Sequence, residues 1–112
     1  TRDRWLTALG WAAGDVPDVL VLEGTWWRET ALRRRLSLLT DVTETAFPDI
    51  FTGRSGAARV AYSCAYGAAR AAEVAHVCAH AGTPLIVQIG TCGALQPGIG
   101  TGTVAVPRTV LA

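Results

Sequence analysis

The stretch LIVQIGTCGAL, residues 85–95, decides the fold that we predict for this chain. It begins with a short run of branched apolar side chains, which is typical of a strand buried on both faces of a parallel sheet. Gly90 ends that run, and Thr91, Cys92 and Gly93 follow it. We therefore expect a core strand over residues 85–90, whose carboxyl end opens into a loop where a ligand can approach the backbone closely.

Strand and helix patterns alternate on the amino-terminal side of this stretch. DVLVLEG, residues 18–24, predicts another buried strand, and ARVAYSC, residues 58–64, predicts a third. A helix is expected after each of these two strands. The first should start from an N-cap at Thr25, and the second is the alanine-rich run 68–81, which Gly82 ends. This order predicts an α/β fold with a mostly parallel sheet and helices outside it.

The other segments carry weaker patterns. We expect a helix over residues 2–13, an edge strand or ordered loop over 42–51, a turn at GRSG (53–56) and a last strand at TVAV (103–106). In the helix that follows Thr25, leucines recur at helical spacing while the arginines of the 33–35 triplet fall mostly on other faces. We interpret this basic triplet as a solvated helix face rather than a phosphate or nucleic-acid patch.

The composition bears on the class of function. The chain has 112 residues, enough for one small domain, and its net charge of +1 provides no field to attract nucleic acid or an anionic membrane. No apolar run approaches the roughly 18 residues of a membrane span, and the first residues do not resemble a secretory signal. Three cysteines without CxxC spacing fit a reducing compartment. We therefore predict a cytoplasmic protein with no nucleic-acid or membrane partner.

The carboxyl-terminal third lacks acidic side chains. The last carboxylate is Glu73, and the chain contains no methionine, not even at position 1. We interpret the sequence as a processed, trimmed or incomplete chain, and residues 1–112 as a single partial domain. A mechanism that needs a carboxylate after Glu73 would have to take it from elsewhere.

Two strand ends are candidates for a ligand site, because ligands of open α/β sheets gather at the carboxyl ends of strands. At the first end, Gly24 precedes a helix whose N-terminus can face an anion, and Arg28 lies one turn into that helix. At the second end, Thr91 offers a hydroxyl and an N–H group beside glycines. We expect the two ends to converge on a pocket for a small anion beside a sugar, although Arg28 alone also reads as a surface arginine.

Three stretches resemble the purine-nucleoside and uridine phosphorylase superfamily, in that family's order. PLIVQIGTCGALQPGIGTGTVAVP (84–107) is similar to its signature region, LEGTWWR (22–28) to its phosphate loop, and VAYSCAYGAARAAEVAHVCAHAG (60–82) to the strand, turn and helix between them. The resemblance implies a three-layer α-β-α fold of which this chain is the N-terminal half. It also implies a parent that is a homo-oligomer.

The resemblance assigns roles to particular residues. It implies phosphate binding by Gly24, Arg28 and Thr91, and nucleoside binding by Tyr66, Cys92 and Gly93. It implies no metal and no cofactor, with phosphate as the co-substrate. Four positions depart from the family pattern: Thr25 for aspartate, Trp26 for proline, Gln88 for a second phosphate-binding arginine, and Thr103 for aspartate.

The activity implied is cleavage of the N-glycosidic bond of a nucleoside, with ribosyl transfer to phosphate, in nucleoside salvage. No catalytic residue is assigned, because the family's ribose and base carboxylates lie beyond Ala112, and we expect this segment alone to be inactive. Gln88 brings no charge, so a nucleosidase that uses water is the first alternative. The second alternative is a non-catalytic, truncated or degenerate fold unit with an uncovered apolar face, which would self-associate.

Two other chemistries can be read from the sequence. Cys92 at a strand-to-loop elbow could be a nucleophile as in class I glutaminases, but Ala94 stands where the elbow needs glycine and no histidine follows it. His76 and His80, spaced i, i+4, could place two metal ligands on one helix face, but no third ligand has suggestive spacing.

Overall fold

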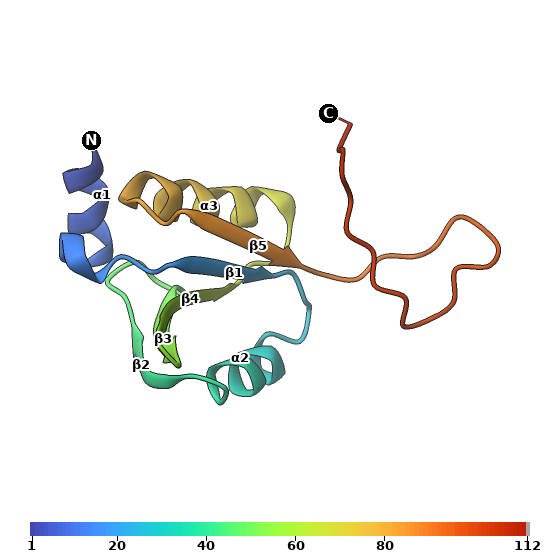
Figure 1. The fold of residues 1–112 in the computed structure, drawn as a ribbon, viewed down its shortest axis with the longest axis horizontal. Helices are drawn as coiled ribbons and strands as arrows, with labels where there is room; N and C mark the ends of the chain where they lie inside the picture. The colour runs from blue at the N-terminus through green and yellow to red at the C-terminus, as the bar shows by residue number, and fades with distance from the viewer. Residues whose placement is uncertain (112) are drawn as a thin grey trace.

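The alternation of strand and helix patterns is realised as a single five-stranded sheet with helices on both faces. The computed structural model describes residues 1–111 (Figure 1). The elements in chain order are α1 (Arg2–Leu9), a 3-10 turn (Ala13–Asp15), β1 (Val19–Glu23), α2 (Arg28–Leu36), β2 (Thr40–Glu44), β3 (Phe51–Ser55), β4 (Ala58–Cys64), α3 (Ala68–Ala81) and β5 (Leu85–Ile89).

The sheet has the strand order β2-β3-β4-β1-β5. β1 runs parallel to both β4 and β5, while β3 is antiparallel to its two neighbours. Four of the five strands therefore point the same way, which confirms the prediction of a mostly parallel sheet. The strands with branched apolar side chains lie in the parallel part, and the short hairpin strands lie at the β2 edge.

Helices cover the two faces of the sheet and make three layers (Figure 1). α3 packs on one face, with α1 against it, and α2 packs on the other. The larger core lies beneath α3 and includes Leu20, Val74 and Cys78, none of which is exposed. A smaller core beneath α2 contains Ala31, Tyr62 and Cys64. The alanines of α3 allow this helix to lie close to the strands, as its composition suggested.

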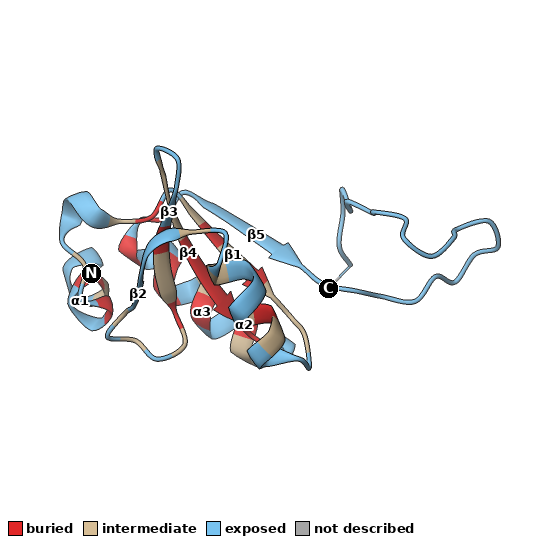
Figure 2. Cartoon of the chain, turned by 90° about the horizontal axis from the view of Figure 1, so that it is seen from below, coloured by how far each residue is buried: buried red, intermediate tan, exposed pale blue. Residues whose placement is uncertain are grey.

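The strand over residues 85–89 is present, but it is not the buried core strand that we predicted. β5 forms one edge of the sheet and all five of its residues are exposed (Figure 2). Its apolar side chains contact the sheet through β1 alone, because none of the described residues pairs with its outer edge. An apolar run predicts a strand from local preference, whereas burial depends on a neighbour that the run itself does not specify.

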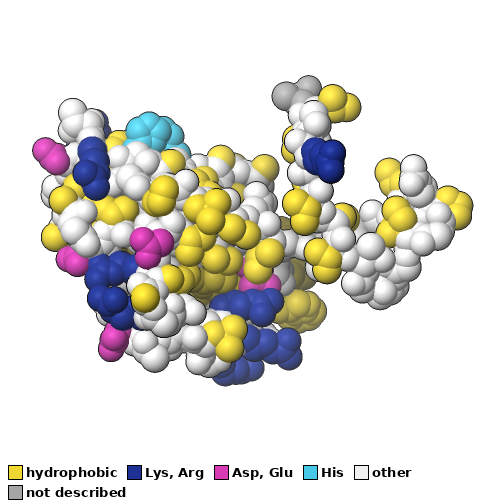
Figure 3. All heavy atoms as spheres, viewed as in Figure 1, with side chains coloured by type: hydrophobic (Ala, Val, Ile, Leu, Met, Phe, Trp, Pro, Cys, Tyr) yellow, Lys and Arg dark blue, Asp and Glu magenta, His cyan; other side chains and the backbone are white. Residues whose placement is uncertain are grey.

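Three local predictions were also wrong. Residues 103–106 form no strand; residues 90–111 lead away from the sheet without a helix or strand and expose apolar side chains (Figure 3). Thr25 does not cap α2, which begins three residues later, at Arg28, after Trp27. GRSG is not wholly a turn, because Gly53 to Ser55 belong to β3 and the chain reverses at Gly56–Ala57.

Two other features bear on the sequence analysis. The arginines of the 33–35 triplet are exposed on α2, as expected of a solvated face (Figure 3). Among the described residues, no helix combines the length and the apolar character needed to cross a membrane.

Candidate functional site

The carboxyl ends of three neighbouring strands meet at one edge of the sheet. The Gly24 N–H donates to the Ile89 carbonyl oxygen (3.2 Å), and the Ala65 N–H donates to the Glu23 carbonyl oxygen (2.9 Å). The parallel registers of β1 with β4 and β5 therefore continue to the strand tips. The loops that begin at Gly24, Ala65 and Gly90 consequently leave the sheet side by side.

Gly24 itself has a different role from the one predicted. Its N–H is occupied by the bond to Ile89, so it is not available to an anion. Its φ is not positive, and an added Cβ would meet only the Ala65 carbonyl oxygen at 3.5 Å, an ordinary contact. The backbone N–H groups of Thr25 and Trp26 have no protein partner among the described residues. In this loop, they are the donors that an anion would find.

Arg28 is the first residue of α2 and lies at the carboxyl edge, as the sequence suggested. Its guanidinium, however, forms an ion pair with Asp49 in the β2–β3 connection. Arg70 of α3 approaches the other oxygen of the same carboxylate at 3.6 Å. Neither Asp49 nor Arg70 was singled out from the sequence, because the contact joins three separate segments.

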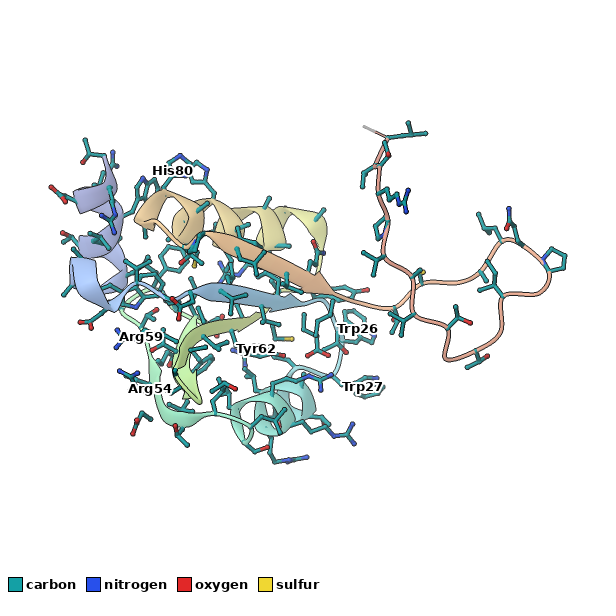
Figure 4. The ribbon with its side chains drawn as sticks, in the orientation of Figure 1. Trp26, Trp27, Arg54, Arg59, Tyr62 and His80 are labelled. Carbon is teal, nitrogen blue, oxygen red and sulfur yellow. The ribbon has the colours of Figure 1, made fainter. Side chains whose placement is uncertain are left out.

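Tyr66 follows β4 and stacks on Trp26, with ring centroids 4.7 Å apart and planes inclined by 29°. The tyrosine is 59% exposed and the tryptophan 74% exposed, so the stacked pair presents aromatic surface to solvent beside the strand tips (Figure 4). Gly67 comes next with φ of 93°, which turns the chain into α3. The sequence analysis noted Trp26 only as a departure from a family pattern, not as a partner of Tyr66.

The residues after β5 do not close over this edge. Thr91, Cys92 and Gly93 are exposed and continue away from the sheet (Figure 1). No hydrogen bond joins them to Arg28 or Tyr66 within residues 1–111. Gln88, also exposed, pairs in register with Leu22 on β1. The structure therefore brings Gly24, Arg28 and Tyr66 to one edge and starts the Thr91 loop there, without forming an enclosed pocket.

A polar cluster lies beneath α2, next to the tip of β1. One Glu23 carboxylate oxygen accepts hydrogen bonds from Arg35 Nε (2.8 Å) and Tyr62 Oη (2.9 Å), and the other accepts from Arg35 Nη2 (3.1 Å). The bonds from Arg35, and secondarily that from Tyr62, hold the pKa of Glu23 below its ordinary value despite some burial. Burial and the bond to Glu23 raise the pKa of the Tyr62 phenol. The cluster therefore holds an ionised carboxylate and a neutral phenol.

Two hollows occur on the described part of the chain. One, of about 350 Å³, lies between the tip of β1 and α2, and is lined by Glu23, Thr25, Trp27, Thr30, Ala31, Arg34 and Arg35. The other, of about 200 Å³, lies at the opposite edge and is lined by Gly10, Trp11, Asp15, Asp41, Thr52, Gly53, Arg54 and Arg59 (Figure 4). Because ligands of open α/β sheets bind at the carboxyl edge, we consider the first hollow part of the candidate site.

The two rival chemistries gain no support from the geometry. α3 runs back across the sheet, so His76 and His80 lie toward its amino edge, whereas Cys92 follows the carboxyl end of β5. The two histidine rings lie 4.0 Å apart and pack against Trp5 of α1. Among residues 1–111, no group of three or more histidine, cysteine or acidic side chains is placed to hold a metal ion.

Comparison with known proteins gave one match. No curated protein and no solved structure matches the chain. Residues 21–112 match the sequence model of the family described as the Phosphorylase superfamily. The matched stretch begins within β1 and contains every residue discussed at the carboxyl edge, whereas α1 lies outside it.

Proposed function

The chain belongs to the phosphorylase superfamily, and on this premise we propose that it serves N-glycosidic bond cleavage in a nucleoside, with transfer of the ribosyl group to phosphate. The reaction breaks the bond between the anomeric carbon and the base nitrogen, and forms a bond from that carbon to a phosphate oxygen. The departing base takes up a proton. The transition state resembles a ribosyl cation, so the anion must be held beneath the anomeric carbon.

The observation that carries this proposal is the junction of β1 and β5 through the Gly24–Ile89 hydrogen bond of 3.2 Å. It starts the two loops to which the family resemblance assigns phosphate at neighbouring points of one sheet edge. The backbone N–H groups of Thr25 and Trp26 and the guanidinium of Arg28 supply donors on the β1 side. Thr91 would supply a hydroxyl and an N–H group on the β5 side.

The base would lie against the stacked pair of Tyr66 and Trp26. Stacking of a base on an aromatic side chain contributes roughly 1–3 kcal/mol and does not depend strongly on which base it is. The exposed faces of this pair lie next to the loop that follows Gly24, where the anion is proposed to bind. The sugar would then span the short distance between the anion and the aromatic pair, with Cys92 and Gly93 on the β5 side.

A nucleosidase that uses water is the second candidate function, and Gln88 favours it. Glutamine offers one donor but no charge, so it stabilises a phosphate dianion less than an arginine would. The ion pair of Arg28 with Asp49 acts in the same direction, because it partly neutralises the positive charge on the β1 side. Water needs no such charge.

The test is an assay of base release from inosine and from uridine, with and without inorganic phosphate. Phosphorolysis requires phosphate and yields ribose 1-phosphate, whereas hydrolysis proceeds in its absence and yields ribose. Arg28→Ala should raise the phosphate concentration needed for half-maximal rate, while Arg33→Ala, an exposed arginine on the same helix, should not. Base release that is independent of phosphate would support the nucleosidase, and no release of either base would support a non-catalytic unit.

The family membership also supports a cytoplasmic, homo-oligomeric protein of nucleoside salvage. Size-exclusion chromatography with light scattering measures the oligomeric state directly. A monomer at all concentrations would contradict that part of the proposal.

A further inference from the structure

Two arginines from different helices approach the two oxygens of a single carboxylate at the carboxyl edge of the sheet. Arg28 Nη2 pairs with Asp49 Oδ1, and Arg70 Nη2 lies 3.6 Å from Asp49 Oδ2. Arg28 begins α2 and Arg70 lies in the first turn of α3, on opposite faces of the sheet. Asp49 comes from the connection between β2 and β3 and reaches both of them.

The backbone of Asp49 is held in an unusual conformation that presents its carboxylate to these arginines. Its φ is 68°, in the left-handed region that residues other than glycine seldom adopt. Its N–H donates to Glu44 Oε2 (3.0 Å), and its carbonyl oxygen accepts from the hydroxyl of the fully buried Ser63 (2.8 Å). Both backbone groups are therefore fixed to the sheet, and the side chain position follows from them.

A pair of guanidinium groups around one oxyanion is also the arrangement that binds phosphate. We propose that Arg28 and Arg70 form an anion site in which Asp49 is an internal occupant, and that inorganic phosphate binds there by displacing the Asp49 carboxylate. The inference rests on the proposed function, which places phosphate beside Arg28. It adds Arg70 as the second positive charge of the site, a charge that Gln88 does not provide.

The charges explain why displacement is needed. The two arginines and the aspartate sum to +1, whereas the arginines alone sum to +2 and match a phosphate dianion. Arg70 is also paired with Glu73 (3.0 Å) and donates to the Pro48 carbonyl oxygen (3.2 Å), so its guanidinium is oriented even when Asp49 moves away.

The existing contacts are weak enough to be exchanged. The side chains of Arg28, Asp49 and Arg70 are 46%, 40% and 32% exposed. Ion pairs with this much exposure to water contribute little, so an external dianion can replace one of them. Removing the internal carboxylate should accordingly tighten phosphate binding by about three- to tenfold.

The experiment is a titration of the full chain with inorganic phosphate at constant ionic strength, followed by isothermal calorimetry. Asp49→Asn removes the charge, and asparagine tolerates a positive φ, so the loop keeps its conformation. Asp41→Asn is the matched control, because Asp41 also has a positive φ (54°) but lies in the hollow at the opposite edge. We expect tighter phosphate binding in Asp49→Asn and no change in Asp41→Asn.

A second pair of variants tests the added arginine. Arg70→Ala should weaken phosphate binding by about tenfold, as Arg28→Ala does, whereas the exposed Arg33→Ala should not. If only Arg28→Ala weakens binding, Arg70 and Asp49 have no part in the site, and this inference fails while the proposed function stands. If Arg28→Ala has no effect, the phosphate assignment itself fails and takes this inference with it.

The fold of each variant is checked by circular dichroism. Should Asp49→Asn unfold the chain, Asp49→Gly replaces it, because glycine adopts a positive φ without strain and also lacks the charge. An unchanged phosphate affinity in whichever of these variants is folded would overturn the proposal.

Discussion

Replacing Glu23 with glutamine should destabilise the protein in a way that depends on pH. Glu23 ends β1 immediately before the loop of the candidate site, and its side chain is only 14% exposed. It accepts two hydrogen bonds from Arg35 and one from Tyr62. Glutamine has the same shape but no charge, and its amide has one acceptor oxygen where the carboxylate has two.

The expected loss of unfolding free energy is about 2 kcal/mol, from two contributions of comparable size. The Arg35 side chain is 44% exposed and can return to water, so the lost ion pair accounts for about 1 kcal/mol. Tyr62 is 2% exposed and its hydroxyl can still donate to the amide oxygen. That bond loses only its charge assistance, which is worth about 1 kcal/mol.

The pH dependence follows from the direction of the pKa shift. The bonds from Arg35, and to a smaller extent that from Tyr62, lower the pKa of Glu23 below its ordinary value of 4.5. A carboxyl group with a lowered pKa adds stability above its ordinary pKa, and this contribution is lost as the pH falls through the lowered value. The difference between the parent protein and Glu23→Gln should therefore be complete at pH 7 and shrink below pH 4.5.

Urea unfolding followed by the fluorescence of the four tryptophans measures both effects. A loss of about 2 kcal/mol corresponds to a midpoint lower by about 1 M urea at pH 7. Glu29→Gln is the control, because Glu29 is exposed in the first turn of α2 and should contribute only about 0.3–1 kcal/mol. A loss at Glu23 no larger than the control, or one that does not change between pH 7 and pH 3, would refute this account of the cluster.

Two further predictions concern cysteines and glycines. Burial raises the pKa of the Cys78 thiol to about 12, while Cys92 is exposed, so at pH 8 iodoacetamide should modify Cys92 in the folded protein and reach Cys78 only on unfolding; mass spectrometry of the digested protein would show this, and equal labelling of both would contradict it. Gly67→Ala should cost about 1–2 kcal/mol because φ is 93°, although an added Cβ meets no atom within 4 Å, whereas Gly24→Ala should cost less than Gly67→Ala because its φ is not positive; equal thermal shifts in the two variants would show that φ is not the cause.

Much of the fold followed from local sequence patterns. The strand at residues 58–64 and the helix at 68–81 have the predicted bounds, and Gly82 ends the helix with φ of 111°. These patterns succeed because alanine favours helix, branched side chains favour strand, and a left-handed residue at a helix end favours glycine, each without reference to distant residues. The parallel arrangement followed in turn from the alternation of such elements.

The sequence also placed candidate residues at the correct edge of the sheet. Gly24, Arg28 and Tyr66 each follow or begin an element whose direction is known once the sheet is parallel. The convergence of the loops after β1 and β5 is a consequence of that geometry. The partners of these residues, however, were not predictable, since a side chain contact joins segments whose separation along the chain carries no local signal.

The tertiary structure alone decided which of these groups are free and which are engaged. Arg28 pairs with Asp49, Tyr66 stacks on Trp26, and the Gly24 N–H is used by Ile89. The apolar run 85–89 lies at an exposed edge because burial is set by the order of strands in space, which local preference does not encode. Sequence thus determined the elements and their direction, and packing determined the pairs of charges and rings on which the proposed chemistry depends.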